Sequence, residues 1–148
     1  MCVLGAAAAE ETKPCPFCEI VSGHRAAAIV YRDETVLAIM DNAPRNPGHV
    51  LVIPVQHAEN LLMLPPETAR QMMTLAQKIA RALKQTDLRA EGIQLQMNTG
   101  KAAGQTVFHA HLHIIPRYAG EPAPRAETDK VPDIELEAAA LKIRAQLK

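Results

Sequence analysis

The stretch VFHAHLHII, Val107 to Ile115, has a histidine at every second position and an apolar residue at each position between. In a strand, successive side chains point to opposite faces, so His109, His111 and His113 would share one face. On a helix the same spacing would turn each side chain by about 200° and scatter the three rings. The pattern therefore predicts a strand with one histidine face. Its other face would pack on the core through Phe108, Ala110, Leu112 and Ile114.

Histidine accounts for only six of the 148 residues, and other polar side chains would serve equally well on a solvated sheet face. Three partly exposed histidines are therefore the weaker interpretation, and two functional ones stay open. Imidazole is the commonest metal ligand in proteins, so this face could bind a metal. Alternatively, one imidazole acts as a nucleophile or general base that its neighbours orient.

The CPFC motif, Cys15 to Cys18, bears on this choice because it has the C-x2-C spacing of half a tetrahedral zinc site. A thioredoxin-like redox motif would need a strand before it, and little but an Ala-, Glu- and Lys-containing tail precedes Cys15. A zinc site needs two more ligands, and histidines are available. One structural zinc would use two of them and leave the others for chemistry.

The composition excludes several classes of partner. The length of 148 residues fits one domain, and contents of 48% apolar and 22% charged residues are typical of a soluble globular protein. Sixteen basic residues balance sixteen acidic ones, so nothing favours nonspecific binding to nucleic acid or to an anionic membrane. No apolar run is long enough for a membrane span, and MCVLGAAAA lacks the basic region of a signal peptide. Three cysteines, two of them in CxxC, favour a reducing cytoplasm.

Hydrophobic patterning predicts an alternation of strands with one long helix. Residues 1–14 are expected to be a flexible tail, and EPAPRAETDKVP, 121–132, a polar linker or arm. Strands are expected at 29–32 and 36–40 around a turn at Asp33, at HVLVIPV ending near Pro54, and at IQLQMN, with Ile93, Leu95 and Met97 on a half-buried face. Helices are expected from Glu67 to Gln85 and from Ile134 to Leu147, both amphipathic. Strands in hairpin-like order predict an α+β fold on an antiparallel sheet.

Several segments together resemble the histidine triad (HIT) family. HAHLHII resembles its signature, LAIMDNAPRNPGH its nucleotide-binding segment, GHVLVIPVQHAENL its following strand and NTGKAAGQTVFHAHLHIIPR its active-site loop and strand. CPFCEIVSG resembles the start of zinc-bearing members of the Hint-like branch. The resemblance covers about residues 15–118. It implies a HIT domain at 15–118, a tail at 1–14, and a C-terminal arm and helix at 119–148.

What the resemblance implies is a homodimeric nucleotide hydrolase or transferase. In this family the central histidine attacks the α-phosphorus of a nucleoside 5′-phosphoramidate or a related adenylylated compound. A nucleotidyl-histidine forms, and water then releases the nucleoside monophosphate, here AMP. Carried over, His111 is the nucleophile and His113 contacts the phosphoryl oxygens and assists the leaving group. His49 completes the catalytic set, and Gln105 and Thr106 are expected to donate hydrogen bonds near the phosphate.

The nucleotide site implied by the family draws on several segments. Asp41 is expected to accept hydrogen bonds from the ribose hydroxyls; from the sequence alone, a residue that ends a strand is an equal interpretation. An apolar base pocket would use Phe17, Ile20, Ile39 and Met40, which are also ordinary core residues. With two Phe and no Trp, no strong aromatic clamp on the base is expected. The expected nucleotide-binding residues are Phe17, Ile20, Asp41, Asn42, Asn98, Gly104, Gln105, Thr106, His111 and His113.

The resemblance also implies a structural zinc. In zinc-bearing relatives the CxxC pair is completed by a histidine after the IP-x-x-H strand and by the first histidine of the triad. The metal ligands would then be Cys15, Cys18, His57 and His109. A closed Cys2His2 set of this kind is structural rather than catalytic. No organic cofactor is expected.

Three alternatives stay open. All three triad histidines could bind a catalytic metal, although no HxxE or HxHxDH pattern accompanies them. The substrate could be a dinucleoside polyphosphate, which would keep the mechanism and change the leaving group. The chain could also be a nucleotide-binding module without catalysis.

Overall fold

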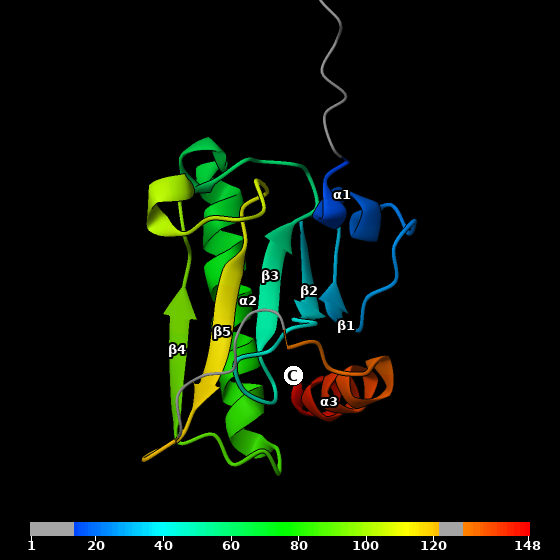
Figure 1. Cartoon of the computed structure of the whole chain (residues 1–148), viewed down its shortest axis with the longest axis vertical. Helices are drawn as coiled ribbons and strands as arrows, with labels where there is room; N and C mark the ends of the chain where they lie inside the picture. Colours follow the sequence, from blue (N-terminus) through cyan, green and yellow to red (C-terminus); the bar gives the residue numbers. More distant parts are fainter. Residues whose placement is uncertain (1–13, 122–128) are drawn as a thin grey trace, which may run out of the picture.

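Five strands form one antiparallel sheet in the spatial order β1-β2-β3-β5-β4 (Figure 1). The structure is a computed structural model that describes residues 14–121 and 129–148. Residues 1–13 of the expected tail, with Cys2, and most of the expected linker lie outside the described residues. The strands are β1 (Ile29–Arg32), β2 (Val36–Met40), β3 (Val50–Pro54), β4 (Gly92–Gln96) and β5 (Leu112–Arg117). The helices are α1 (Pro16–Val21), α2 (Pro66–Gln85) and α3 (Asp133–Gln146), with short 3-10 turns η1 (Leu61–Met63) and η2 (Lys101–Ala103).

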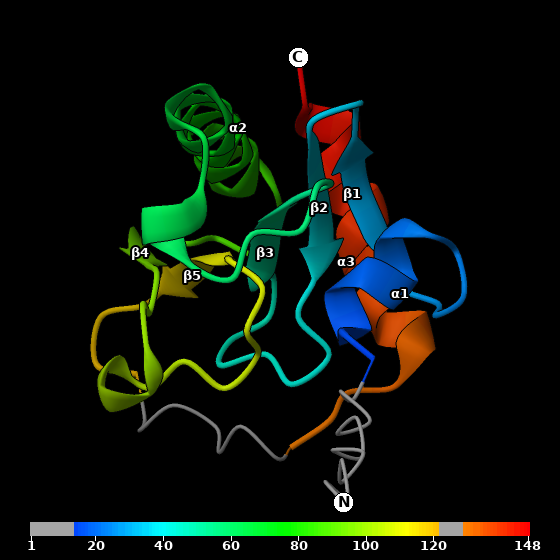
Figure 2. The ribbon, with the colours of Figure 1, turned by 90° about the horizontal axis from the view of Figure 1, so that it is seen from above.

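The two faces of the sheet carry different layers, because alternate residues of each strand point to opposite sides. On one face, Ala38, Val50 and Val52 pack in the main core against buried residues of α2 and α3. On the other face, Leu37, Ile39, Leu51 and Ile53 pack against Phe17 of α1. Figure 2, a view from above, shows that α1 and α2 lie well apart from each other. The expected α+β fold is confirmed.

The sequence patterns locate most elements correctly. The hairpin of β1 and β2 turns at Asp33, whose carboxylate accepts hydrogen bonds from the backbone N–H groups of Thr35 and Val36, both at 2.8 Å. The long helix α2 begins one residue before the expected Glu67. Its buried residues recur at helical spacing: Met72, Leu75, Ala76, Ile79, Ala82 and Leu83. Among the described residues, no helix is both long and apolar enough to span a membrane.

The histidine stretch is only partly a strand, which corrects the prediction. β5 begins at Leu112, and the last pair that joins it to β3 is Val52 with Leu112. Beyond that pair the Pro54 carbonyl lies 2.9 Å from the ring Nε2 of His109, and no strand pairing continues there. His109 and His111 therefore lie in an irregular segment just before the strand. Phe108, expected on the core face, is 46% exposed.

The strand β4 also departs from its expected pattern. It lies at the edge of the sheet and pairs only with β5. Ile93 and Met97 pack against the main core as expected. Leu95, expected on the same half-buried face, is 42% exposed. Alternation alone does not bury a side chain on an edge strand, because no neighbouring strand covers its outer side.

Candidate functional site

Four sulfur and nitrogen ligand atoms from three segments meet behind the histidine stretch. Cys15 is the N-cap of α1, and its Sγ accepts a hydrogen bond from the Cys18 N–H at 3.4 Å. The Nδ1 atom of His109 lies 3.4 Å from the Sγ of Cys15 and 3.6 Å from that of Cys18. The Nδ1 atom of His57 lies 3.3 Å from the Sγ of Cys18 and 3.1 Å from the Nδ1 of His109. The four expected metal ligands are thus brought together.

The chemistry of this cluster fits a tetrahedral metal. Bonds of about 2.0–2.3 Å to a central zinc imply separations of about 3.3–3.8 Å between ligand atoms, close to those observed. The Nε2–H of His109 donates to the Pro54 carbonyl at 2.9 Å, which leaves the Nδ1 lone pair directed at the cysteines. Both cysteines are free thiols. In the absence of a cation, burial and the neighbouring Cys15 raise the pKa of Cys18 to about 11. This cluster could therefore hold a metal ion.

A cavity of about 410 Å³ lies beside this cluster. Its walls come from α1, the ends of β2 and β3, the glycine loop before β5, and the start of α3. The polar side chains at one end are Asp41, Asn42, Arg45, His49, Asn98, Thr106, His111 and His113. The other lining residues include the apolar Phe17, Ile20, Ala26, Ala27, Ala28, Ile39, Met40 and Leu136, together with the charged Arg25, Asp133 and Glu137. One polar end, and another end with apolar faces and charged side chains at its edge, would suit a ligand that has both a charged group and a planar part.

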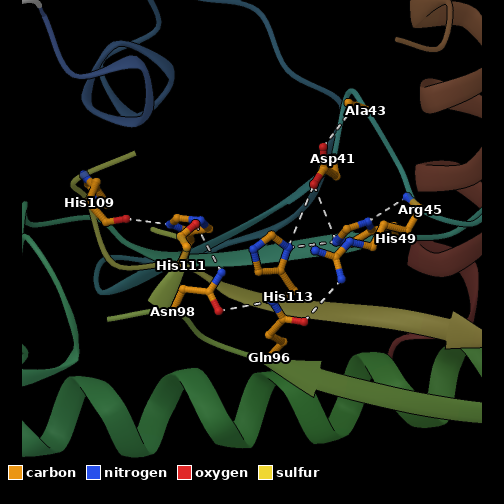
Figure 3. Close-up of polar contacts among 10 residues, drawn as sticks. Asp41, Ala43, Arg45, His49, Gln96, Asn98, His109, His111 and His113 are labelled. Carbon is orange, nitrogen blue, oxygen red and sulfur yellow. Dashed lines mark hydrogen bonds and ion pairs between the residues drawn. The ribbon is translucent and has the colours of Figure 1, made fainter. Parts of the chain in front are cut away.

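His111 is held in one orientation at the polar end. Its Nδ1–H donates to the His109 carbonyl at 2.7 Å (Figure 3). A neutral imidazole that donates from Nδ1 has an unprotonated Nε2. The ring of Phe17 contacts that of His111 edge-on, with 5.2 Å between centroids. His111 lines the cavity and is otherwise buried. Nε2, with its free lone pair, is therefore the ring nitrogen available to a ligand.

His49 and His113 form a hydrogen-bonded pair whose tautomers follow from the backbone. The Arg45 backbone N–H donates to Nδ1 of His49 at 3.1 Å, so the ring proton of His49 is on Nε2. That Nε2–H donates to Nδ1 of His113 at 2.9 Å. Neutral His113 then carries its own proton on Nε2. Figure 3 shows this series of contacts from Arg45 to His113.

Burial keeps both rings neutral near pH 7. It lowers the pKa of His49 to about 4, although the Asp41 carboxylate opposes this effect. It lowers the pKa of His113 to about 3, with further lowering by the neighbouring His49, His111 and Arg45. The Asp41 Oδ2 atom lies 3.5 Å from Nε2 of His49 and 4.0 Å from Nδ1 of His113. Asp41 directly follows β2, and its carboxylate accepts the Ala43 N–H at 2.9 Å. Asp41 therefore both ends the strand and lines the cavity.

The glycine loop closes the polar end. Gly104 has a φ of 92°, a conformation that favours glycine, and its carbonyl accepts from the Asn98 amide at 3.4 Å. Asn98 is in turn linked through Gln96 to the Arg45 guanidinium, with contacts of 3.1 and 3.3 Å. Thr106 lines the cavity as expected. These contacts connect the edge strand β4 to the loop and to the segment after β2.

Gln105 differs from its expected role. Its side chain is buried at 3% exposure and does not line the cavity. Both amide hydrogens are used inside the protein, on the carbonyls of Glu59 at 2.6 Å and Val107 at 3.0 Å. Its Oε1 accepts the Gly100 N–H at 2.8 Å. The carboxamide therefore fixes the shape of the loop and has no hydrogen left to donate to a phosphate.

Five more of the predicted residues line the cavity, and a few contributors were not foreseen. Asn42, Phe17, Ile20, Ile39 and Met40 all line the cavity. The sequence reasoning missed Arg45, Gln96 and the start of α3. Nothing local indicates that Arg45 contributes a backbone N–H, because that contact depends on the path of the loop. The pattern of α3 does indicate a shared helix face, because Asp133, Leu136 and Glu137 are three and four positions apart. That this face lies on the cavity depends on tertiary packing.

Comparison with known proteins identifies a protein family that this chain matches. The model of the HIT domain matches residues 22–120. An uncharacterized HIT-like protein of Saccharolobus solfataricus is 43% identical over 108 residues, which is 73% of this chain and 77% of that protein. The adenylylsulfatase HINT3 of Arabidopsis thaliana is 38% identical over 104 residues, covering 70% of this chain and 52% of that protein.

Solved structures agree with the fold. A Hit-like protein from Bartonella henselae matches with a TM-score of 0.83 and 39% identity, over 88% of this chain and 94% of the other. A zinc-bound histidine triad family protein from Mycobacterium smegmatis matches with a TM-score of 0.79 and 43% identity, over 90% and 92% of the two chains. A HIT family hydrolase from Clostridium thermocellum matches with a TM-score of 0.65 and 35% identity, over 75% and 96%.

Proposed function

Because this chain belongs to the histidine triad (HIT) family, we propose that it hydrolyses nucleoside 5′-phosphoramidates or related adenylylated compounds through a nucleotidyl-histidine. The products are the nucleoside monophosphate, AMP for an adenosine substrate, and the released amine. The observation that carries this proposal is the tautomer of His111. Its Nδ1–H is committed to the His109 carbonyl, so its Nε2 is a neutral nucleophile on the cavity wall.

In the first step the Nε2 lone pair of His111 forms a bond to the α-phosphorus. The phosphorus–nitrogen bond to the leaving amine breaks, and its electron pair goes to that nitrogen. The departing nitrogen needs a proton. Water supplies this proton, because a neutral His113 that gave up its Nε2–H would be left as an imidazolate. The Nε2–H of His113 donates a hydrogen bond to the departing nitrogen, since Nδ1 of His113 already accepts from His49. The same Nε2–H can contact a phosphoryl oxygen, as expected for His113.

In the second step water attacks the phosphorus of the nucleotidyl-histidine. The bond from phosphorus to Nε2 breaks, its electron pair returns to His111, and the attacking water releases one proton to the solvent. The Nδ1–H contact with the His109 carbonyl stabilises the positive ring of the intermediate, because a charged donor makes a stronger hydrogen bond. Positioning of this kind suits phosphoryl transfer, in which alignment contributes much of the rate.

The substrate is oriented by the other end of the cavity. We assign the ribose hydroxyls to Asp41, whose carboxylate lines the cavity and lies 3.5 Å from Nε2 of His49. The base occupies the apolar side near Phe17 and Ile20. Thr106 and Asn98 lie at the loop that faces the phosphate, and Gln105 acts by holding that loop in shape.

We further propose that Cys15, Cys18, His57 and His109 bind zinc. Zinc here supplies a structural cross-link, because four protein ligands leave no open position for a substrate. The cross-link joins α1 to the residue whose carbonyl orients His111. Free thiols at both cysteines accord with a reducing cytoplasm as the location.

A homodimer is the assembly that we propose for this chain. Among the described residues β4 is an edge strand with no partner on its outer side. Exposed apolar side chains at this end of the sheet and near the glycine loop include Leu95 and Phe108. Unpaired edge strands and exposed apolar groups favour association. Light scattering that reports a monomer at micromolar concentration would contradict the dimer.

The test compares adenosine 5′-phosphoramidate with diadenosine tetraphosphate by following AMP release. Fast release from the phosphoramidate, lost in His111→Ala, is the expected result. Preference for the dinucleotide with the same loss in the variant would keep the mechanism and replace the leaving group. No release from either substrate, together with tight AMP binding, would support the non-catalytic module instead.

A further inference from the structure

The base end of the cavity has a wall that lies outside the matched family model. That match ends at residue 120. Asp133, Leu136 and Glu137, in the first two turns of α3, line the same cavity as His111 and His113. Residues three and four positions apart share one face of a helix, so the three side chains form one strip. The inference below rests on the nucleotide site proposed above.

Contacts at both ends fix α3 in this place. Just before the helix, the Val131 N–H donates to the Asn42 carbonyl at 3.0 Å. This bond ties the start of α3 to the residue after Asp41. Near the other end, the Arg144 guanidinium donates to the Ile29 carbonyl. Between them the buried residues of α3 pack into the main core. The position of its first turn relative to Asp41 is therefore set by the fold.

The two carboxylates on this strip are unused acceptors. Within residues 14–121 and 129–148, neither Asp133 nor Glu137 has a side-chain hydrogen bond or an ion pair. Arg25, another charged residue that lines the cavity, is already paired with Glu19 at 2.6 Å. The neighbouring surface is formed by alanines 26–28 and Leu136, which offer no hydrogen bond from their side chains. A base bound here would pack its faces against apolar side chains and would have a carboxylate at its edge.

Purine bases differ in what they present to a carboxylate. The Watson–Crick edge of guanine carries two adjacent donors, N1–H and N2–H, and one carboxylate can accept both. Hypoxanthine keeps N1–H and lacks the exocyclic amine. Adenine presents an N1 lone pair beside its N6–H, so a carboxylate meets one donor and one repelling acceptor. We infer that α3 makes this cavity selective for guanine nucleotides, with Glu137 and Asp133 as the specificity-determining acceptors.

The test measures the affinities of GMP, IMP and AMP for the full-length, zinc-loaded chain by calorimetry. These are reaction products, so binding is measured without turnover. GMP is expected to bind about tenfold more tightly than AMP, with IMP between, as for charge-assisted hydrogen bonds weakened by solvent. In the Asp133→Asn, Glu137→Gln double variant the GMP to AMP ratio should fall to about twofold or less. Removing two negative charges strengthens binding of every nucleotide, so only the ratio reports on the base.

A matched control is Glu135→Gln, which removes an exposed charge of the same helix that does not line the cavity. Its GMP to AMP ratio should equal that of the wild type. Equal affinities for the three nucleotides, or a guanine preference that survives the double variant, would overturn this inference and leave the proposed hydrolysis intact. Failure of all three to bind would overturn the nucleotide site and this inference together.

Discussion

Two histidine clusters lie side by side in this molecule, and their ligand atoms have similar spacing. Cys15, Cys18, His57 and His109 form the first, and Asp41, His49 and His113 the second. In each cluster, nitrogen, oxygen or sulfur atoms lie within 4.8 Å of one another. By distance alone, both could hold a metal ion. The two clusters are distinguished by the hydrogen bond that the other ring nitrogen of each imidazole makes.

In the first cluster the ring proton of His109 points outward, to the Pro54 carbonyl, and a lone pair faces the cysteines. In the second cluster the Arg45 N–H occupies the Nδ1 lone pair of His49 and places a proton between His49 and His113. A metal on Nε2 of His49 would force a proton onto Nδ1, against the Arg45 N–H. The first cluster therefore suits a metal and the second a proton. Backbone contacts assign the two roles.

The largest effect should come from His111, which lies between the two clusters. His111→Ala removes the atom that forms the bond to phosphorus, so kcat on a nucleoside phosphoramidate should fall by at least about 10⁴-fold. His24→Ala is the matched control, because His24 is exposed and lies outside the cavity. Activity in His111→Ala within about tenfold of the wild type would contradict the covalent mechanism.

The next effect separates the clusters by their metal content. The wild type should contain one zinc per chain, and Cys18→Ala should contain less than a tenth of that. Zinc binding can contribute about 10 kcal/mol to folding, which is comparable to the whole stability of a domain, so the variant should unfold at a much lower temperature. Cys2→Ala serves as the control for loss of a thiol.

Metal analysis with calorimetric melting would check both points. A second zinc of similar affinity, lost in His49→Gln rather than in Cys18→Ala, would break the distinction between the clusters.

A smaller effect is expected from His49, which acts through His113. His49→Gln keeps a side-chain amide but loses the imidazole acceptor for the Arg45 N–H. We expect kcat to fall by about 10²-fold, the usual contribution of a positioned hydrogen-bond donor, with a smaller change in KM. Steady-state kinetics at several pH values would measure this change. An unchanged kcat would mean that His49 does not set the tautomer of His113.

Features that depend on a local sequence pattern could be predicted from the sequence. Features that depend on tertiary contacts could not. β2, β3 and α2 follow from apolar periodicity, and the cysteine pair follows from its CxxC spacing. His57 and His109 follow as ligands only from the resemblance to the family. The start of β5 does not, because the pairing with β3 ends at Leu112 and the Pro54 carbonyl of β3 accepts from the His109 ring instead. The carboxamide of Gln105 could point to the cavity or into the loop, and only the neighbouring carbonyls decide. The α3 wall likewise depends on how a distant helix packs.

The smallest effect concerns stability against pH. Burial lowers the pKa of His49 to about 4 and that of His113 to about 3, from an ordinary value of 6.5. The unfolded chain therefore binds more protons than the folded one below pH 6.5. Stability is full above that pH and declines as pH falls toward 4. Each histidine contributes at most about 1.4 kcal/mol per pH unit to the slope.

Urea unfolding of the wild type and of His49→Gln between pH 7 and 5.5 would test this pH dependence, since both keep the same metal ligands. The variant should show a shallower decline. An equal slope in the two proteins would contradict the burial of a neutral His49.

The most direct test of the central claim is to trap the nucleotidyl-histidine. Wild-type enzyme and a nucleoside phosphoramidate are mixed, quenched in alkali, in which phosphorus–nitrogen bonds to histidine survive, and digested for mass spectrometry. We predict one nucleoside monophosphate attached to the peptide that contains His111, and none in His111→Ala. Full turnover by the wild type with no attached nucleotide at early times, or attachment at His113 instead, would contradict it.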